Sequence, residues 1–67
     1  MNKHFHLCLY KDGHEVINCN DVVNIDMCRD LQILTIYVFR LFDDGQCISY
    51  QLEYSYDDFD RFEVNEI

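Results

Sequence analysis

Three side chains near the start of the sequence are of the types that bind zinc. His4, His6 and Cys8 are spaced two residues apart, so on a β-strand they share one face. Imidazole and thiolate are good zinc ligands, and Cys19 or His14 on a returning strand is a candidate to join them. The spacing is not that of a zinc finger, because the sequence has no Cys-x-x-Cys pair. We expect a solvated strand face without metal or cofactor, and keep a metal-binding domain built on His4, His6, Cys8 and Cys19 as an alternative.

The sequence contains the residue types of a cysteine nucleophile and a histidine base, but no catalytic pattern. A nucleophilic cysteine needs a base and an orienting group within hydrogen-bond reach. The sequence has neither a Gly-rich phosphate loop nor a nucleophile elbow. A chain of 67 residues is also too short to build a deep, preorganised cleft. These features predict a protein that is not an enzyme.

The carboxylates of the C-terminal part are a stronger signal. The formal net charge is −8; residues 1–42 carry five acids against four bases, and residues 43–67 carry eight acids against Arg61 alone. This balance disfavours direct binding to nucleic acid or to an anionic membrane and favours a basic protein partner. The predicted partner-binding residues are these acids and two tyrosines among them: Asp43, Asp44, Glu53, Tyr54, Tyr56, Asp57, Asp58, Asp60, Glu63 and Glu66.

The spacing of these acids allows them to imitate phosphates. Carboxylates two residues apart on a strand are separated by about 6.6 Å, roughly twice the axial rise of about 3.4 Å between phosphates on one DNA strand. In size and charge the chain resembles the small acidic inhibitors that bacteriophages make against host nucleic-acid-handling machinery, including anti-CRISPR proteins and other DNA mimics. The resemblance rests on no motif. It implies an inhibitor that occupies the basic nucleic-acid-binding surface of a partner protein.

Two other interpretations of the acidic segment stay open. The acids can serve only to keep a β protein soluble, since net charge keeps strand edges apart. The aromatic side chains can belong to the core, which we expect for Phe59 and Phe62 and leave open for Tyr54 and Tyr56. A third possibility is a self-associating structural or accessory protein, a homodimer in which strand edges of two copies join.

The cysteines and the N-terminal residues predict a compartment. The first residues contain no apolar segment of the kind that a secretory signal requires. The longest apolar stretch, residues 31–42, is shorter than the ~20 residues that span a bilayer. We therefore expect the cytoplasm of the producing or host cell, with the four cysteines as free thiols.

The elements that position these residues are predicted to be strands. Residues 3–10 alternate in polarity, residues 31–42 are β-branched or aromatic on both faces, and residues 47–56 alternate again. Turns are expected at residues 11–13, as a three-residue loop, and at residues 43–45. The predicted fold is β-rich α+β or all-β: an antiparallel sheet of four to five strands from two hairpins, with or without one short helix, in a single domain of residues 1–67.

Some details of the strands are less regular. We expect residues 20–30 to form an irregular connection or a short strand, and residues 31–42 to be the central strand. Ser55 with Asp58 resembles a capping box, which favours a helical turn near residues 56–60 followed by an extended tail. The predicted core contains Phe5, Leu7, Leu9, Ile17, Ile36, Val38, Ile48, Leu52 and Phe62.

Overall fold

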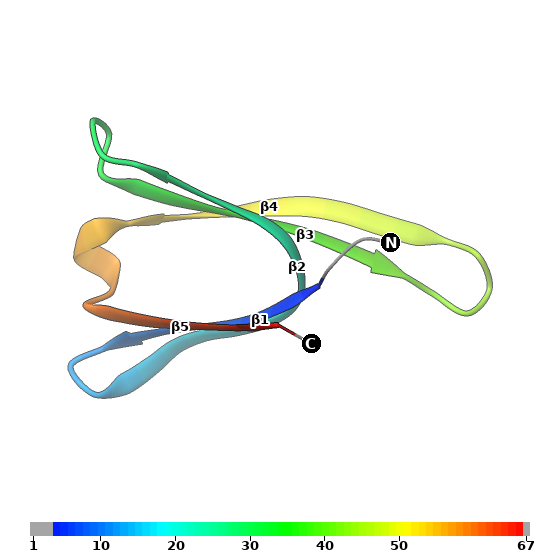
Figure 1. Ribbon diagram of the computed structural model, residues 1–67, viewed down its shortest axis with the longest axis horizontal. Coiled ribbons are helices and arrows are strands. Elements are labelled where there is room, and N and C mark those ends of the chain that lie inside the picture. The colour runs from blue at the N-terminus through cyan, green and yellow to red at the C-terminus, as the bar shows by residue number, and fades with distance from the viewer. Residues whose placement is uncertain (1–3, 67) are drawn as a thin grey trace.

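The computed structural model describes residues 4–66 as one antiparallel sheet (Figure 1). Five strands lie in the order β4-β3-β2-β1-β5, and the only helical element of these residues is a single 3-10 turn, η1. This confirms the predicted β-rich antiparallel fold, in its all-β form. The elements are β1 (Phe5–Lys11), β2 (His14–Cys28), β3 (Ile33–Leu41), β4 (Cys47–Ser55), η1 (Tyr56–Asp58) and β5 (Arg61–Glu66).

The central strand is β2, and it bends the sheet. Its first part pairs with β1 and its second part with β3, and the register shifts on either side of Val22. Such bulges bend a strand and increase its twist. The sheet therefore curls, and η1 joins its two edge strands, β4 and β5, at one end (Figure 1). Of the two expectations for residues 20–30, an irregular connection or a short strand, residues 20–28 are strand, but they form part of the long β2. The expectation of a central strand at residues 31–42 was wrong, because β2 lies in the middle of the sheet.

The first hairpin differs from the expected three-residue loop. Lys11 pairs with His14 across a two-residue turn, in which Asp12 (φ 53°) and Gly13 (φ 80°) are both left-handed. This shorter turn alone would put the wrong face of β2 towards the core. A bulge corrects the register between Leu9 and Tyr10, so that Ile17 lies opposite Leu9 on the apolar face.

The second hairpin and the capped turn confirm their predictions. Gly45 (φ 89°) donates its N–H to the Phe42 carbonyl at 3.0 Å in the loop between β3 and β4. At the end of β4, the Asp58 carboxylate accepts the Ser55 N–H at 3.0 Å, and the Ser55 hydroxyl accepts the Asp57 N–H at 3.3 Å. This capping box starts η1, and the extended tail follows as β5.

The core lies on the inner face of the curled sheet. Of the predicted core residues, Ile48 and Phe62 are 45% and 46% exposed, so their assignment to the core was wrong. Ile48 lies near the end of the protruding β3–β4 hairpin, and Phe62 lies on an edge strand. Phe59, next to η1, is buried as expected. The buried cluster is Leu7, Leu9, Cys19, Val22, Leu34, Ile36, Val38 and Phe59; Phe5, Ile17 and Leu52 pack partly against it.

Candidate functional site

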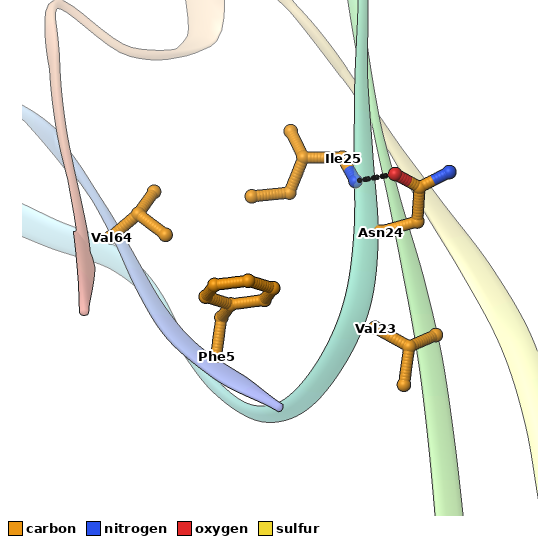
Figure 2. A pocket seen from close by; sticks show the side chains of 5 residues that line it. All are labelled: Phe5, Val23, Asn24, Ile25 and Val64. Carbon is orange, nitrogen blue, oxygen red and sulfur yellow. Dashed lines mark hydrogen bonds between the residues drawn. The ribbon is translucent and has the colours of Figure 1, made fainter. Parts of the chain in front are cut away.

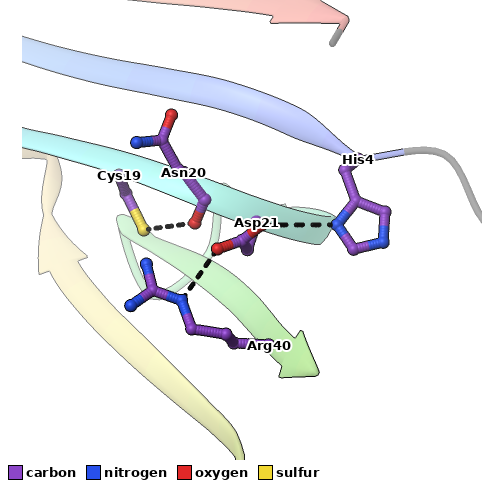
Figure 3. Close-up of polar contacts among 5 residues, drawn as sticks. All are labelled: His4, Cys19, Asn20, Asp21 and Arg40. Carbon is purple, nitrogen blue, oxygen red and sulfur yellow. Dashed lines mark hydrogen bonds and ion pairs between the residues drawn. The ribbon is translucent and has the colours of Figure 1, made fainter. Parts of the chain in front are cut away.

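The structure separates the candidate metal ligands. His6 and Cys8 lie on the outer face of β1, with the imidazole Nε2 3.7 Å from the thiol. Cys19 lies opposite Leu7 on the other face, within the core. His4 instead points to Asp21, with 3.7 Å between Nδ1 and the carboxylate (Figure 3). Among residues 4–66 no group of three or more His, Cys, Asp or Glu side chains is arranged to hold a metal.

The pair of His6 and Cys8 does not have the geometry of a nucleophile and its base. In such sites one imidazole nitrogen faces the nucleophile and the other faces the orienting group. Here the same nitrogen, Nε2, contacts both the Cys8 thiol and the Asn18 side-chain oxygen. Cys8 is only 5% exposed. This arrangement supports a structural polar cluster on the outer face of β1.

That cluster continues across β5 and satisfies its own polar groups. The Tyr10 hydroxyl donates to the Glu63 carboxylate at 3.4 Å, and the Arg61 guanidinium lies 4.2 Å from the centre of the Tyr10 ring. A hydrogen bond with Cys8, with smaller contributions from burial and from the Glu63 charge, raises the pKa of Tyr10. The polar side chains on the outer face of the β1–β5 half therefore pair with one another.

The predicted acidic residues fall into two groups. Four of them lie in η1, in β5 or between the two, and make structural contacts. Asp58 caps η1, and the Asp60 carboxylate accepts the Asp12 N–H at 2.9 Å, which ties the first hairpin turn to the start of β5. Glu63 lies 3.4 Å from Arg61, and Glu66 pairs with Phe5 across the β1–β5 ladder.

The remaining acids follow strand β4. Asp43 and Asp44 lie in the loop before it, Glu53 lies on its outer face, and Asp57 follows it in η1. The β3–β4 loop and η1 lie at opposite ends of the molecule (Figure 1). The predicted acids are thus distributed along β4 and at both its ends, and do not form one compact array.

Tyr54 and Tyr56 are turned towards the core. Tyr54 lies opposite Leu34 on the inner face, and both tyrosines pack against the buried cluster. The Tyr56 ring meets Phe59 edge-on at 6.0 Å. Burial raises the pKa of Tyr54, with smaller contributions from Cys19 and Asp58. These two side chains therefore contribute to packing.

An uncovered surface on the opposite side of β3 was not among the predicted sites. Thr35, Tyr37 and Phe39 lie on the outer face of β3 and are only half-buried. The extensive contacts between elements of residues 4–66 are all between neighbouring strands, so no element makes extensive contacts across this face. The sequence did contain the signal, because residues 31–42 are apolar on both faces and such strands are normally covered on both.

The strand register gives this surface its pattern. One row across β2, β3 and β4 reads Asn24, Tyr37 and Gln51. The next row reads Asp26, Thr35 and Glu53, so two carboxylates flank a threonine at a separation of about 10 Å, two strand spacings. We call the outer-face residues of these three strands the outer surface. It has aromatic side chains at its centre and polar side chains around them.

A small hollow on the inner side is lined almost entirely by apolar groups. Phe5, Ile25 and Val64 face one another across about 220 Å³, with Val23 and Asn24 beside them (Figure 2). The Asn24 side-chain oxygen accepts the N–H of Ile25 at 2.9 Å. Of residues 4–66, those that line the hollow include no acid, base or nucleophile, and its mostly apolar lining favours an apolar group.

Comparisons with known proteins assign the chain to no family, so the function has to be proposed from the structure. No protein-family model, no curated protein and no solved structure matches the chain. Within residues 4–66, no helix has the length and apolar character needed to cross a membrane.

Proposed function

We propose that the chain is a non-enzymatic protein-binding module and that the outer surface is its binding site. The observation that supports this proposal is the uncovered outer face of β3. Tyr37 and Phe39 project from an interior strand and are partly exposed, and the extensive contacts of residues 4–66 are all between neighbouring strands of the sheet. Aromatic side chains inside a polar rim are typical of the residues that dominate the energy of protein interfaces.

The charge of the chain supports a basic partner. Asp26 and Glu53 flank the aromatic centre, and the net charge of −8 attracts a surface rich in Lys and Arg. Complementary charge speeds association, while the apolar contacts slow dissociation. We propose as partner a nucleic-acid-binding protein whose basic surface is occupied, in the cytoplasm of the producing or host cell, in the manner of phage-encoded inhibitors.

The test is capture of basic proteins from a bacterial lysate by the immobilised chain. Capture should decrease when salt is raised to about 1 M, where the screening length falls to about 3 Å. Replacing both aromatic residues, Tyr37→Thr with Phe39→Thr, should abolish capture, because threonine keeps strand propensity but removes the rings. The control is Val16→Thr, an exposed apolar residue in the part of β2 that pairs with β1, away from Tyr37 and Phe39.

Circular dichroism first establishes that all variants are folded. Capture that is lost in the double variant and retained in the Val16 variant supports the proposal. Capture that is indifferent both to salt and to the loss of Tyr37 and Phe39 refutes it.

A further inference from the structure

Strand β4 is a long and regular sheet edge. It is one of the two edge strands of the sheet, and all nine of its residues pair with β3 without a bulge. On its free side, the N–H and C=O groups of alternate residues have no strand partner within residues 4–66. The other edge strand, β5, has six residues, of which Arg61, Glu63 and Glu66 are charged.

Strand β4 also lacks the features by which edge strands usually avoid pairing. Natural edges are protected by Pro, Lys, bulges or short length. Residues 47–55 contain neither Pro nor Lys, and their only charged residue is Glu53. Ile48 and Tyr50, on the inner side of this strand, are 45% and 46% exposed, so an added strand would find apolar side chains next to it.

The charges around β4 indicate which kind of strand can pair with its free edge. Antiparallel pairing of β4 with a second copy over all nine residues would place Gln51 opposite its equivalent. The same register brings the β3–β4 loop of one copy, with Asp43 and Asp44, next to Asp57 and Asp58 of the other. Like charges so placed oppose association. An extended segment with basic residues at both ends would instead meet carboxylates at both ends of β4.

We infer that β4 receives an extended segment of a basic partner as a sixth strand of the sheet. The segment alternates apolar and polar side chains between Lys or Arg residues at its ends. Main-chain hydrogen bonds to the β4 edge supply affinity, and the acids at residues 43–44 and 57–58 supply selectivity. This inference rests on the proposed function, because it specifies how the basic partner is held.

The experiment measures residue-resolved hydrogen exchange of the full chain with a synthetic peptide that alternates threonine and valine between terminal lysines. At a peptide concentration about ten times its Kd, alternate amides of β4 should exchange about tenfold more slowly. The amides of β5 should not change. A control peptide with glutamates in place of the lysines should leave β4 unprotected.

Matched charge variants test the contribution of the acids. Asp43→Asn with Asp57→Asn should weaken binding of the lysine peptide by about threefold to tenfold, the effect of losing two exposed ion pairs. Neither carboxylate accepts a hydrogen bond within residues 4–66, so the fold should be unaffected. The control is Glu15→Gln with Glu63→Gln, which removes the same charge from β2 and β5, away from β4 in the strand order, and should change the affinity by less than about twofold.

Three outcomes overturn the inference. One is unprotected β4 amides at the highest soluble concentration of the lysine peptide. The second is equal protection by the glutamate peptide. The third is a mass that rises with concentration together with protection of β4 in the chain alone, because a second copy then occupies the edge. Salt-sensitive capture that depends on Tyr37 and Phe39, without protection of β4, would leave the proposed function standing and remove only this mode of binding.

Discussion

Replacing each of the three aspartates around η1 by alanine should show which of their carboxylates stabilise the fold. Asp58 and Asp60 each accept a backbone N–H, from Ser55 at 3.0 Å and from Asp12 at 2.9 Å. Such hydrogen bonds contribute about 0.5–1.5 kcal/mol each to stability. In a domain of this size a loss of about 1 kcal/mol lowers Tm by roughly 4–8 °C. We expect that decrease for Asp58→Ala and for Asp60→Ala.

Asp57→Ala is the matched control for these two variants. Its backbone N–H and C=O bond Ser55 and Lys11, but within residues 4–66 its carboxylate accepts no hydrogen bond. The substitution therefore removes the same charge from the same acidic end without removing a bond. It should change the free energy of unfolding by less than about 0.5 kcal/mol, or raise it slightly by relieving repulsion.

Urea unfolding followed by far-UV circular dichroism measures all three free energies, because the chain has no Trp to report by fluorescence. If Asp57→Ala is as destabilising as the other two, the hydrogen bonds contribute nothing beyond the charge and the assignment fails. Asp58→Asn and Asp60→Asn keep an acceptor oxygen and should recover part of the loss.

Three further predictions concern stability and thiol chemistry. Burial raises the pKa of Cys19 above its ordinary 9.0 and that of Tyr54 above 10.0, so the folded state prefers their protonated forms. The contribution of these two groups to stability should therefore be constant below about pH 9 and be lost as pH rises through their folded pKa values. The loss should be less steep in Tyr54→Phe; a decline equal in slope in that variant would exclude Tyr54. Gly13→Ala should cost roughly 1–2 kcal/mol, measured in urea, because φ is 80° although a Cβ has open space there; an unchanged midpoint would argue against the left-handed turn. In a timed alkylation assay followed by mass spectrometry, Cys47, which is exposed, should react first and the buried Cys8 and Cys19 only on unfolding; the reverse order would contradict the burial described.

The sequence alone predicted those elements that depend on residues close together in the chain. The alternation of residues 47–56, the turn at Gly45 and the capping box at Ser55 each depend on neighbours in the chain, and each is present in the structure. The bend of β2 depends on distant pairing. Val22 and Val23 favour a strand, but only the different partners on its two sides, β1 and β3, explain why it kinks there and where its side chains point.

The candidate site depended on the same distant pairing. Counting charges along the chain grouped all the C-terminal acids together, whereas the curl of the sheet assigns Asp58 and Asp60 to bonds that hold η1 and the first turn. The apolar character of both faces of residues 31–42 was visible from the start and was interpreted as that of a central strand. Only the strand order reveals that one of those faces has no cover.

An ion pair links the bend in β2 to the β3–β4 hairpin, which contributes to both surfaces proposed for binding. Arg40 Nε lies 2.9 Å from the Asp21 carboxylate, which joins the start of the protruding β3–β4 hairpin to the bulge in β2 (Figure 3). The outer surface spans β2, β3 and β4, and the free edge belongs to β4, so both include the β4 strand of that hairpin. A strand added to β4 would widen the outer surface by one strand and place its side chains next to Gln51 and Glu53. The edge and the outer surface can therefore act on the same partner at once, the edge through its main chain and the outer surface through Tyr37 and Phe39.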